Sequence, residues 1–315
     1  MIEVKGKNNI SAKVIADSIN QKGIRMTTFE LNFHRYILAE ANTHRILSKN
    51  AASSRAIPLQ SVIQQILNEP AIPVHWGTNN PGMQSKSEMS LENQVIAKEK
   101  WIEAMHKMIE SANILGDKHG LNMHKQNVNR LLEAFTMTKQ VLTGTTFANL
   151  LNLRDHGDAQ PEFRVLASCV KECLEQSKPE LLVPGEWHVP YVTTKRNDFG
   201  KLEYWSNDVT QVNLETARKI SASCCAQVSY RKLDDTIEKA LKIFDMLHLE
   251  DDKNRHKHSS PVEHQGTPID DYNIPFNPNS WEPGITHVRR DGSLWSGNLQ
   301  GWIQYRQLIP NEAVW

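Results

Sequence analysis

Three segments rich in proline, glycine, asparagine and tryptophan limit how far any helix can run in this chain. They cover residues 72–83 (IPVHWGTNNPGM), 183–192 (VPGEWHVPYV) and 274–284 (IPFNPNSWEPG). Proline lacks a backbone donor and fixes φ, so none of these segments continues a helix. Two tryptophans that stand beside histidines, Trp76 and Trp187, either anchor these loops or cover a flat ligand.

Apolar residues at helical spacing predict three helices between these loops. The first begins at a Ser90 cap and ends near Gly116 or Gly120, the second covers residues 127–135, and the third covers residues 235–247. The side chains expected to face the core are, in order, Val95, Ile102, Met105, Ile109 and Ala112, then Leu131 and Leu132, then Ile237, Leu241, Phe244 and Leu247.

Length and charge favour an enzyme over a protein that binds a polymer. The 315 residues can bury a substantial core, and 36 basic against 36 acidic residues leave no broad positive field. We therefore expect no nucleic-acid polymer as partner. The N-terminus MIEVKGKNNI lacks an apolar run and no stretch reaches membrane-spanning length, so we expect no membrane association and a cytoplasmic location.

Four cysteines in a chain of this length do not make a disulfide framework. Cys169 and Cys173 lie at helical spacing in an apolar stripe, and residues 224–225 are adjacent cysteines in a run of small residues. Core packing is therefore expected for all four. A loose group of histidines lacks carboxylate or cysteine partners at ligand spacing, so no metal site is expected. These histidines are His256, His258 and His264.

A short polar run, THRILSKNAASSRAIP at residues 43–58, is the strongest functional signal. Arg45 and Arg55 each offer a planar fork of donors that suits phosphate oxygens. Small hydroxyl and amide side chains between them add donors without filling the space of a ligand. A phosphorylated ligand is the functional interpretation, and a solvated polar loop is the alternative. The small donors are Ser48, Asn50, Ser53 and Ser54.

This run resembles the motif of the flavin-dependent thymidylate synthases, RHRxxSxNExSxRY. Three positions depart from it: Thr43 replaces an arginine, Ala51 a glutamate and Ala56 a tyrosine. These departures affect ligand contacts more than the fold. The matching residues are His44, Arg45, Ser48, Asn50, Ser53 and Arg55.

A second block at residues 149–162, NLLNLRDHGDAQPE, is similar to the family's NFLNLRxxxHAQxE. The resemblance implies that Arg154 contacts and polarises a pyrimidine ring, whereas the alternative role for Arg154 is a surface salt bridge at a helix end. Asp158 stands where the family has a histidine beside the flavin. Two matches in the same order support each other.

A third match comes out of order. AQVSY at residues 226–230 and SPVEH at residues 260–264 resemble segments that precede the arginine motif in the family, so the chain looks circularly permuted. GWIQYR at residues 301–306 is a weaker echo of the motif's lead. The expected fold is α+β, a flavin-dependent thymidylate synthase-like arrangement with helices packed on a mostly antiparallel sheet. In it, residues 11–30, which end in TTFE, form the strand before the motif.

One domain over residues 1–315 is expected, with long loops at about 68–90, 178–210 and 250–298. The resemblance, to a divergent and phage-like member, implies C5 methylation of dUMP to dTMP with FAD, methylenetetrahydrofolate as carbon donor and NADPH as reductant. It also implies a homotetramer with shared active sites and, if phage-encoded, a location in the host cytoplasm. None of the four cysteines stands beside an arginine or histidine in sequence, as a nucleophilic thiolate would require.

The resemblance also implies individual roles. Because Glu40 and Asp158 are carboxylates at positions where the family has glutamine and histidine, dCMP is an alternative substrate and hydroxymethylation an alternative reaction. A nucleotide-binding homologue without chemistry is the alternative of another class. The expected nucleotide-binding residues are Glu40, Ser53, Ser54, Arg55, Arg130 and the catalytic Arg154. The expected flavin-binding residues are His44, Arg45, Ile46, Thr143, Asn149, Asp158, Ser229 and His264.

Overall fold

The computed structural model describes residues 2–229, 236–248, 259–272 and 277–310. In this part of the chain, a six-stranded sheet follows the order β1-β2-β3-β5-β4, with β6 pairing in parallel beside β2 and every other pair antiparallel. The strands are β1 (Glu3–Lys5), β2 (Ser11–Ile19), β3 (Arg25–His34), β4 (Ser48–Ala51), β5 (Met137–Gly144) and β6 (Glu180–Leu181).

The predicted single strand over residues 11–30 is two strands, because the chain turns between β2 and β3. Gly23 lies in this turn with φ of 76°, a conformation that glycine adopts without strain. Alternation along β3 sends Phe29, Leu31 and Phe33 to one face and Thr28 to the other. The two faces therefore meet different parts of the protein.

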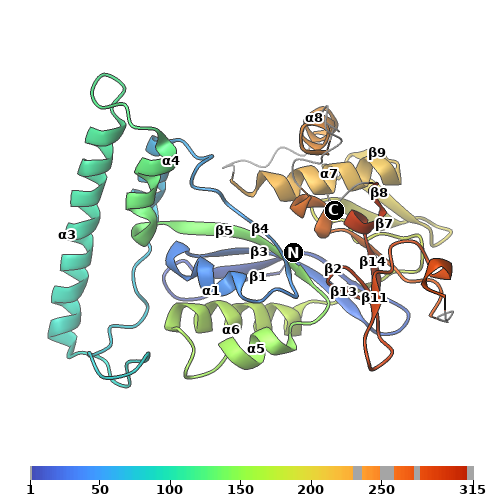
Figure 1. Cartoon of the computed structure of the whole chain (residues 1–315), viewed down its shortest axis with the longest axis horizontal. Helices are drawn as coiled ribbons and strands as arrows, with labels where there is room; N and C mark the ends of the chain where they lie inside the picture. Colours follow the sequence, from blue (N-terminus) through green and yellow to red (C-terminus); the bar gives the residue numbers. More distant parts are fainter. Residues whose placement is uncertain (1, 230–235, 249–258, 273–276, 311–315) are drawn as a thin grey trace.

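Two helices cover the Phe29 face of the sheet (Figure 1). They are α5 (Ala148–Arg154) and α6 (Pro161–Gln176), and Pro161 opens α6 at the position where proline is tolerated. Their apolar side chains, among them Phe163, complete one core with the strands. Cys169 and Cys173 are buried in this core, and Cys224 and Cys225 are buried elsewhere, so the prediction of core cysteines is confirmed.

The second half of the chain covers the other face of the sheet, through residues 187–192 and α7 (Leu214–Ala226) (Figure 1). Trp187 is 4% exposed in this half, so it anchors its loop. The remaining elements here are β7 (Thr193–Arg196), β8 (Leu202–Ser206), β9 (Thr210–Val212), η3 (Gln227–Ser229), α8 (Ile237–His248), η4 (Ser260–Glu263), β10 (Gly266–Pro268), η5 (Pro278–Ser280), β11 (His287–Val288), β12 (Leu294–Ser296), β13 (Leu299–Gln300), β14 (Trp302–Gln304) and η6 (Tyr305–Leu308).

A helical arm extends beyond the end of the sheet at which β5 begins, on the left of Figure 1. It contains α3, whose start is fixed by Ser90, since its side chain accepts a hydrogen bond from the Asn93 amide at 3.3 Å. The predicted cap is confirmed, but Val95 is 58% exposed rather than buried. The arm comprises α2 (Leu59–Asn68), α3 (Leu91–Gly116), α4 (Lys125–Val128) and η2 (Asn129–Phe135), and η1 (Arg35–Ile37) with α1 (Leu38–Asn42) connects β3 to β4.

Two other helix predictions need correction. Residues 127–135 are largely 3₁₀ helix, and Leu131 is 40% exposed while Leu132 is buried. In α8, Ala240 and Ile243 are buried. The four residues predicted to face the core are only half-buried, and they are Ile237, Leu241, Phe244 and Leu247. The long segment at 178–210 contains strands β6 to β8 and is no continuous loop.

The α+β class with helices on a mostly antiparallel sheet is confirmed by this architecture. The permuted order of its pieces stays a prediction. No helix within the described residues is long and apolar enough to cross a membrane.

Candidate active site

Arg154 and His44 bring the two sequence blocks into contact. Arg154 ends α5, and its Nε donates to His44 Nε2 at 3.0 Å. The guanidinium lies 4.8 Å from the ring centroid of Phe163, which is 2% exposed, so a buried aromatic face supports it from below. His44 itself is 7% exposed. The guanidinium is thereby held in one orientation.

The hydrogen bond also fixes the protonation of His44. An arginine Nε–H only donates, so His44 Nε2 carries a lone pair and the ring proton lies on Nδ1. Burial first, then the charges of Arg154 and Lys49, lower the pKa of His44 to about 4. His44 is therefore a neutral acceptor at neutral pH.

A cleft of about 990 Å³ opens beside Arg154. Glu40 borders it, with Oε1 4.0 Å from Arg154 Nη1, and its Oε2 is buried without a described hydrogen-bond partner. Asp158 also lines the cleft, and its carbonyl accepts a hydrogen bond from the Gln84 side chain. Other lining side chains are Tyr36, His75, Lys86, Trp101, Gln160, Glu162 and Arg164.

Glu162 connects two segments of the chain that line this cleft. It is 2% exposed, and its carboxylate accepts hydrogen bonds from the Val74 amide at 2.9 Å and from the Gln160 side chain at 2.8 Å. Burial, and then the Glu162 charge, raise the pKa of Tyr36 well above its usual range. Glu162 thus ties the loop after α2 to the start of α6.

The cleft includes residues that no motif indicates. His75 lies on the wall with Nδ1 3.0 Å from Glu88, and Trp101 comes from α3. Trp76 packs edge-on against Trp101 at 6.4 Å between centroids, so it anchors the loop. These residues come from α3 and from the loop between α2 and α3, where helix periodicity and loop composition are the only signals in the sequence.

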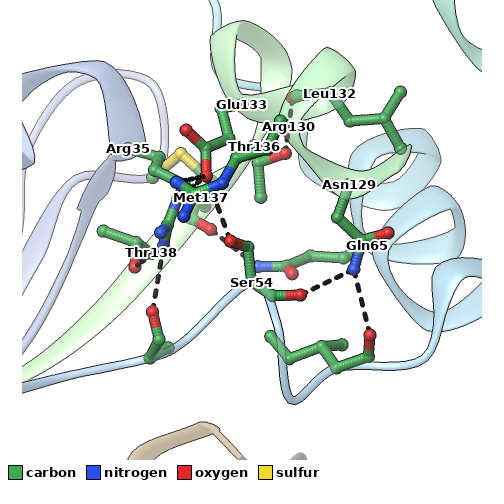
Figure 2. A network of polar contacts seen from close by, with 12 residues as sticks. Arg35, Ser54, Gln65, Asn129, Arg130, Leu132, Glu133, Thr136, Met137 and Thr138 are labelled. Carbon is green, nitrogen blue, oxygen red and sulfur yellow. Dashed lines mark hydrogen bonds and ion pairs between the residues drawn. The ribbon is translucent and has the colours of Figure 1, made fainter. Parts of the chain in front are cut away.

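A second pocket of about 220 Å³ lies where the turn after β4 meets η2 (Figure 2). Ser54 lines it and donates to Glu133 at 3.1 Å, and the same carboxylate oxygen accepts from Arg130 at 3.0 Å. Arg35, which sequence reasoning did not select, lies in this wall as well. Two predicted nucleotide-binding residues therefore meet here, at a pocket that shares no lining residue with the larger cleft.

Two other residues of the arginine run bind the second half of the chain. Ser48 accepts a hydrogen bond from the Asn298 side chain at 3.0 Å. Asn50 donates to the Cys225 carbonyl at 2.6 Å and accepts from Ser260 at 3.2 Å. Their role in this structure is to join β4 to the second half.

His264 and Thr143 lie in a buried polar chain between the halves. Thr143 Oγ1 is 2.8 Å from His264 Nδ1 and 2.7 Å from Thr28 Oγ1, which is 2.8 Å from His188 Nε2. His188 Nδ1 then lies 2.9 Å from Ser18 Oγ. His264 is 0% exposed, so its ring is enclosed by protein.

The predicted site residues thus occupy different places. Glu40, His44, Arg154 and Asp158 gather at the larger cleft, and Ser54 and Arg130 gather at the smaller pocket. Arg45, Ser53, Arg55 and Asn149 are exposed, Ile46 is half-buried, and Ser229 is the last residue of η3. His256 and His258 lie outside the described residues.

No group of three metal-ligating side chains occurs among the residues that the structure describes.

Comparison with known proteins identifies the family. The model of the thymidylate synthase complementing proteins matches residues 24–180, about half of the chain, and includes both motif blocks. A search of curated proteins finds no match.

Among solved structures, the UMP/dUMP methylase PolB from Streptomyces cacaoi bound with 5-Br UMP shares 13% identity, over 55% of this chain and 92% of that chain, with a TM-score of 0.46. The flavin-dependent thymidylate synthase ThyX from Helicobacter pylori, complexed with FAD and dUMP, shares 21% identity over 47% of this chain and 67% of that chain, with a TM-score of 0.32. On the evidence of the family model and its two motif blocks, the chain belongs to the thymidylate synthase complementing proteins, as a flavin-dependent thymidylate synthase-like enzyme.

Proposed function

We propose that the protein methylates C5 of a pyrimidine deoxynucleotide, converting dUMP to dTMP with FAD, methylenetetrahydrofolate as carbon donor and NADPH as reductant. One observation carries the proposal. His44 from the first motif block orients Arg154 from the second at 3.0 Å, beside a cleft of about 990 Å³. The two motif blocks, which are separate in sequence, therefore meet at the Arg154 guanidinium.

The residues of the cleft fit a flavin. Its volume lies at the upper end of the range of about 300–1,000 Å³ that is usual for cofactor sites. Tyr36 and Trp101 offer aromatic surface for a flat ring, and Lys86 and Arg164 offer positive charge for phosphates. When bound, the flavin supplies the electrons that reduce the transferred carbon to a methyl group.

Arg154 acts on the base. Its Nε is occupied by His44, so the Nη groups remain to donate to a carbonyl oxygen of the pyrimidine. Donors fixed beforehand stabilise the negative charge that the ring develops as C5 becomes nucleophilic. Phe163 beneath the guanidinium and His44 beside it keep this donor group from rotating.

Glu40 bears on the choice of base. A carboxylate accepts from the N3–H of uracil or from the amino group of cytosine, so dCMP is the alternative substrate. Glu40 Oε1 lies 4.0 Å from Arg154 Nη1. The Glu40 carboxylate therefore already has a partner in Arg154, and its presence does not require a cytosine amino group in the site. This pairing favours dUMP. A hydroxymethyl product is the alternative outcome of the carbon transfer.

A homotetramer with shared active sites is part of the proposal. Ser53 and Arg55 are exposed on the turn after β4, whereas Arg154 lies at the larger cleft. A second copy that brings this turn, and the smaller pocket beside it, to the cleft would supply donors for the nucleotide phosphate, in addition to the Lys86 and Arg164 charges available to the flavin phosphates.

Two measurements test the function. FAD is titrated into wild type and Arg45→Ala and followed by visible absorption, and tritium release from C5-labelled dUMP and dCMP is measured with wild type and Arg154→Lys. We expect flavin binding that weakens in Arg45→Ala, and release from dUMP that is lost in Arg154→Lys. Nucleotide binding without release would support the catalytically inactive homologue, which the departures at Thr43, Ala51 and Ala56 favour.

A further inference from the structure

Glu133 collects three donors on one carboxylate oxygen. Its Oε1 accepts hydrogen bonds from Arg35 Nε at 3.0 Å, Arg130 Nη1 at 3.0 Å and Ser54 Oγ at 3.1 Å (Figure 2). Two arginines and a hydroxyl around one anionic oxygen are the donor set that phosphate also prefers. The Glu133 carboxylate therefore accepts hydrogen bonds from a set of donors that could also bind an anionic ligand.

The position of Glu133 allows exchange with a ligand. It lies in the wall of the pocket of about 220 Å³, together with Arg35, Ser54 and Lys139. A volume of this size holds a phosphate group with part of the molecule that bears it. Lys139, whose side chain is 46% exposed and whose Nζ lies 3.7 Å from Glu30, is a further basic residue in the wall. An anion that enters the pocket therefore meets the charges of Arg35 and Lys139 together with two carboxylates, Glu133 among the donors and Glu69 elsewhere in the wall.

The donors are held with different strength. Arg35, with a side chain 12% exposed, also donates to the Ala52 carbonyl at 2.9 Å and to Thr138 at 3.3 Å, so it stays in place without Glu133. Arg130 is 56% exposed, and its pair with Glu133 is an i,i+3 surface pair, a kind that contributes little stability. Arg130 can therefore move from Glu133 to a ligand at low cost.

Asn129 gives an independent indication of a ligand. It is 1% exposed, and its Nδ2 donates to the Ser54 carbonyl at 2.7 Å and to the Ile57 carbonyl at 3.0 Å. Its Oδ1 is buried without a hydrogen-bond partner in the described structure, although Asn129 lines the pocket. Such an acceptor costs free energy unless a donor reaches it, and a hydroxyl of a ligand would be such a donor.

Ser54 and Arg130 are nucleotide-binding residues that the resemblance implies, and we propose that Glu133, which pairs with both, is an internal substitute for the phosphate monoester of the nucleotide. The inference rests on the proposed function for the identity of the nucleotide. When the nucleotide binds, Ser54 and Arg130 donate to phosphate oxygens instead of the Glu133 carboxylate. Arg35 keeps its hydrogen bond to the Ala52 carbonyl. The retained negative charge of Glu133 opposes the phosphate, which weakens binding and eases release of the methylated product, also a phosphate monoester.

The test compares wild type with Glu133→Gln in the full chain. Glutamine keeps the shape and an acceptor oxygen but removes the charge. Calorimetry measures the affinities for dUMP, for deoxyuridine and for inorganic phosphate at two salt concentrations. We expect dUMP to bind about 3- to 10-fold more tightly in Glu133→Gln, with a stronger salt dependence and unchanged affinity for deoxyuridine.

A matched control is Glu103→Gln, which removes the same charge from the exposed face of α3, where Glu103 pairs with Lys100 and Lys107. It should leave all three affinities unchanged. Arg130→Ala is the second variant, because an exposed side chain can be removed without loss of the fold. It should weaken the binding of dUMP and phosphate but not of deoxyuridine.

The outcomes separate this inference from the proposed function. Tighter binding of inorganic phosphate by Glu133→Gln, in a protein that does not bind dUMP, supports the anion site and contradicts the proposed substrate. Unchanged or weaker binding of dUMP and phosphate by Glu133→Gln, at an unchanged melting temperature, overturns the role of Glu133. An equal change for dUMP and deoxyuridine overturns it too, because the effect would not belong to the phosphate.

Discussion

Arg154 Nε and His44 Nε2 form a hydrogen bond of 3.0 Å between residues 110 positions apart. The hydrogen bond gives the two side chains different roles. His44, buried and neutral, has no positive charge of its own to offer an anion, but it holds the guanidinium that has one. We therefore expect His44 to act as a positioning residue for Arg154.

The first prediction concerns this acceptor. Glutamine at position 44 can still accept from Arg154, whereas leucine cannot, so His44→Gln should retain more activity than His44→Leu. Misplacing a catalytic group by about 1 Å costs on the order of 100-fold in rate, and we expect a loss of that size in kcat for His44→Leu. Tritium release from labelled dUMP measures it. Equal activities of the two variants would contradict the positioning role.

The second prediction is a pH limit on activity. The pKa of His44 is about 4, so the ring stays neutral throughout the neutral range and no change in kcat near pH 6.5 should come from it. Below about pH 5 the ring begins to gain a proton, can no longer accept from Arg154 and repels its charge. The kcat profile of wild type should fall there, and His44→Gln should lack this fall, since an amide does not titrate.

How far the sequence predicts this site depends on the local geometry. The resemblance implies Arg154 and Glu40 at the nucleotide and His44 at the flavin, and in the structure all three lie at one cleft. Ser48 and Asn50 were expected to offer donors to phosphate, but β4 turns them toward the second half of the chain. The run SKNA has no apolar alternation, so its sequence indicates neither a strand nor its faces.

The helix corrections have a similar origin. In η2 the buried residues are Asn129, Leu132 and Phe135, three apart, as the 3₁₀ helix requires, and this turns Leu131 outward. The prediction assumed a period of 3.6 residues. In α8, Ala240 is fully buried in the core that it shares with α7, and a small residue gives an apolar pattern too weak to identify the buried face.

The third prediction concerns stability in acid. Burial lowers the pKa of His188 to about 4 and that of His264 to about 3, against about 6.5 in the unfolded chain. The unfolded state therefore binds more protons below pH 6.5. The contribution of both neutral rings is fully present above that pH and is lost as pH falls toward 4, by several kcal/mol in order of magnitude.

Urea unfolding between pH 7.5 and 4.5 measures this loss. Wild type should lose stability steeply, and a His188→Gln variant should lose less over the same range, although its stability at pH 7.5 will be lower. Parallel pH profiles for the two proteins would show that the buried polar chain does not control acid stability.

The last prediction separates the two uses of the polar run. Asn50 donates to the buried Cys225 carbonyl and accepts from Ser260, so Asn50→Ala leaves a buried acceptor unsatisfied. Such a loss costs about 1–3 kcal/mol of unfolding free energy. Ser53 is exposed on the following turn, and surface substitutions usually stay within about 0.5 kcal/mol, so Ser53→Ala is the matched control. Urea unfolding at pH 7.5 should show a lower midpoint for Asn50→Ala alone. If both variants unfold like wild type, β4 does not depend on this contact to join the second half of the chain, and Asn50 would be available to a ligand.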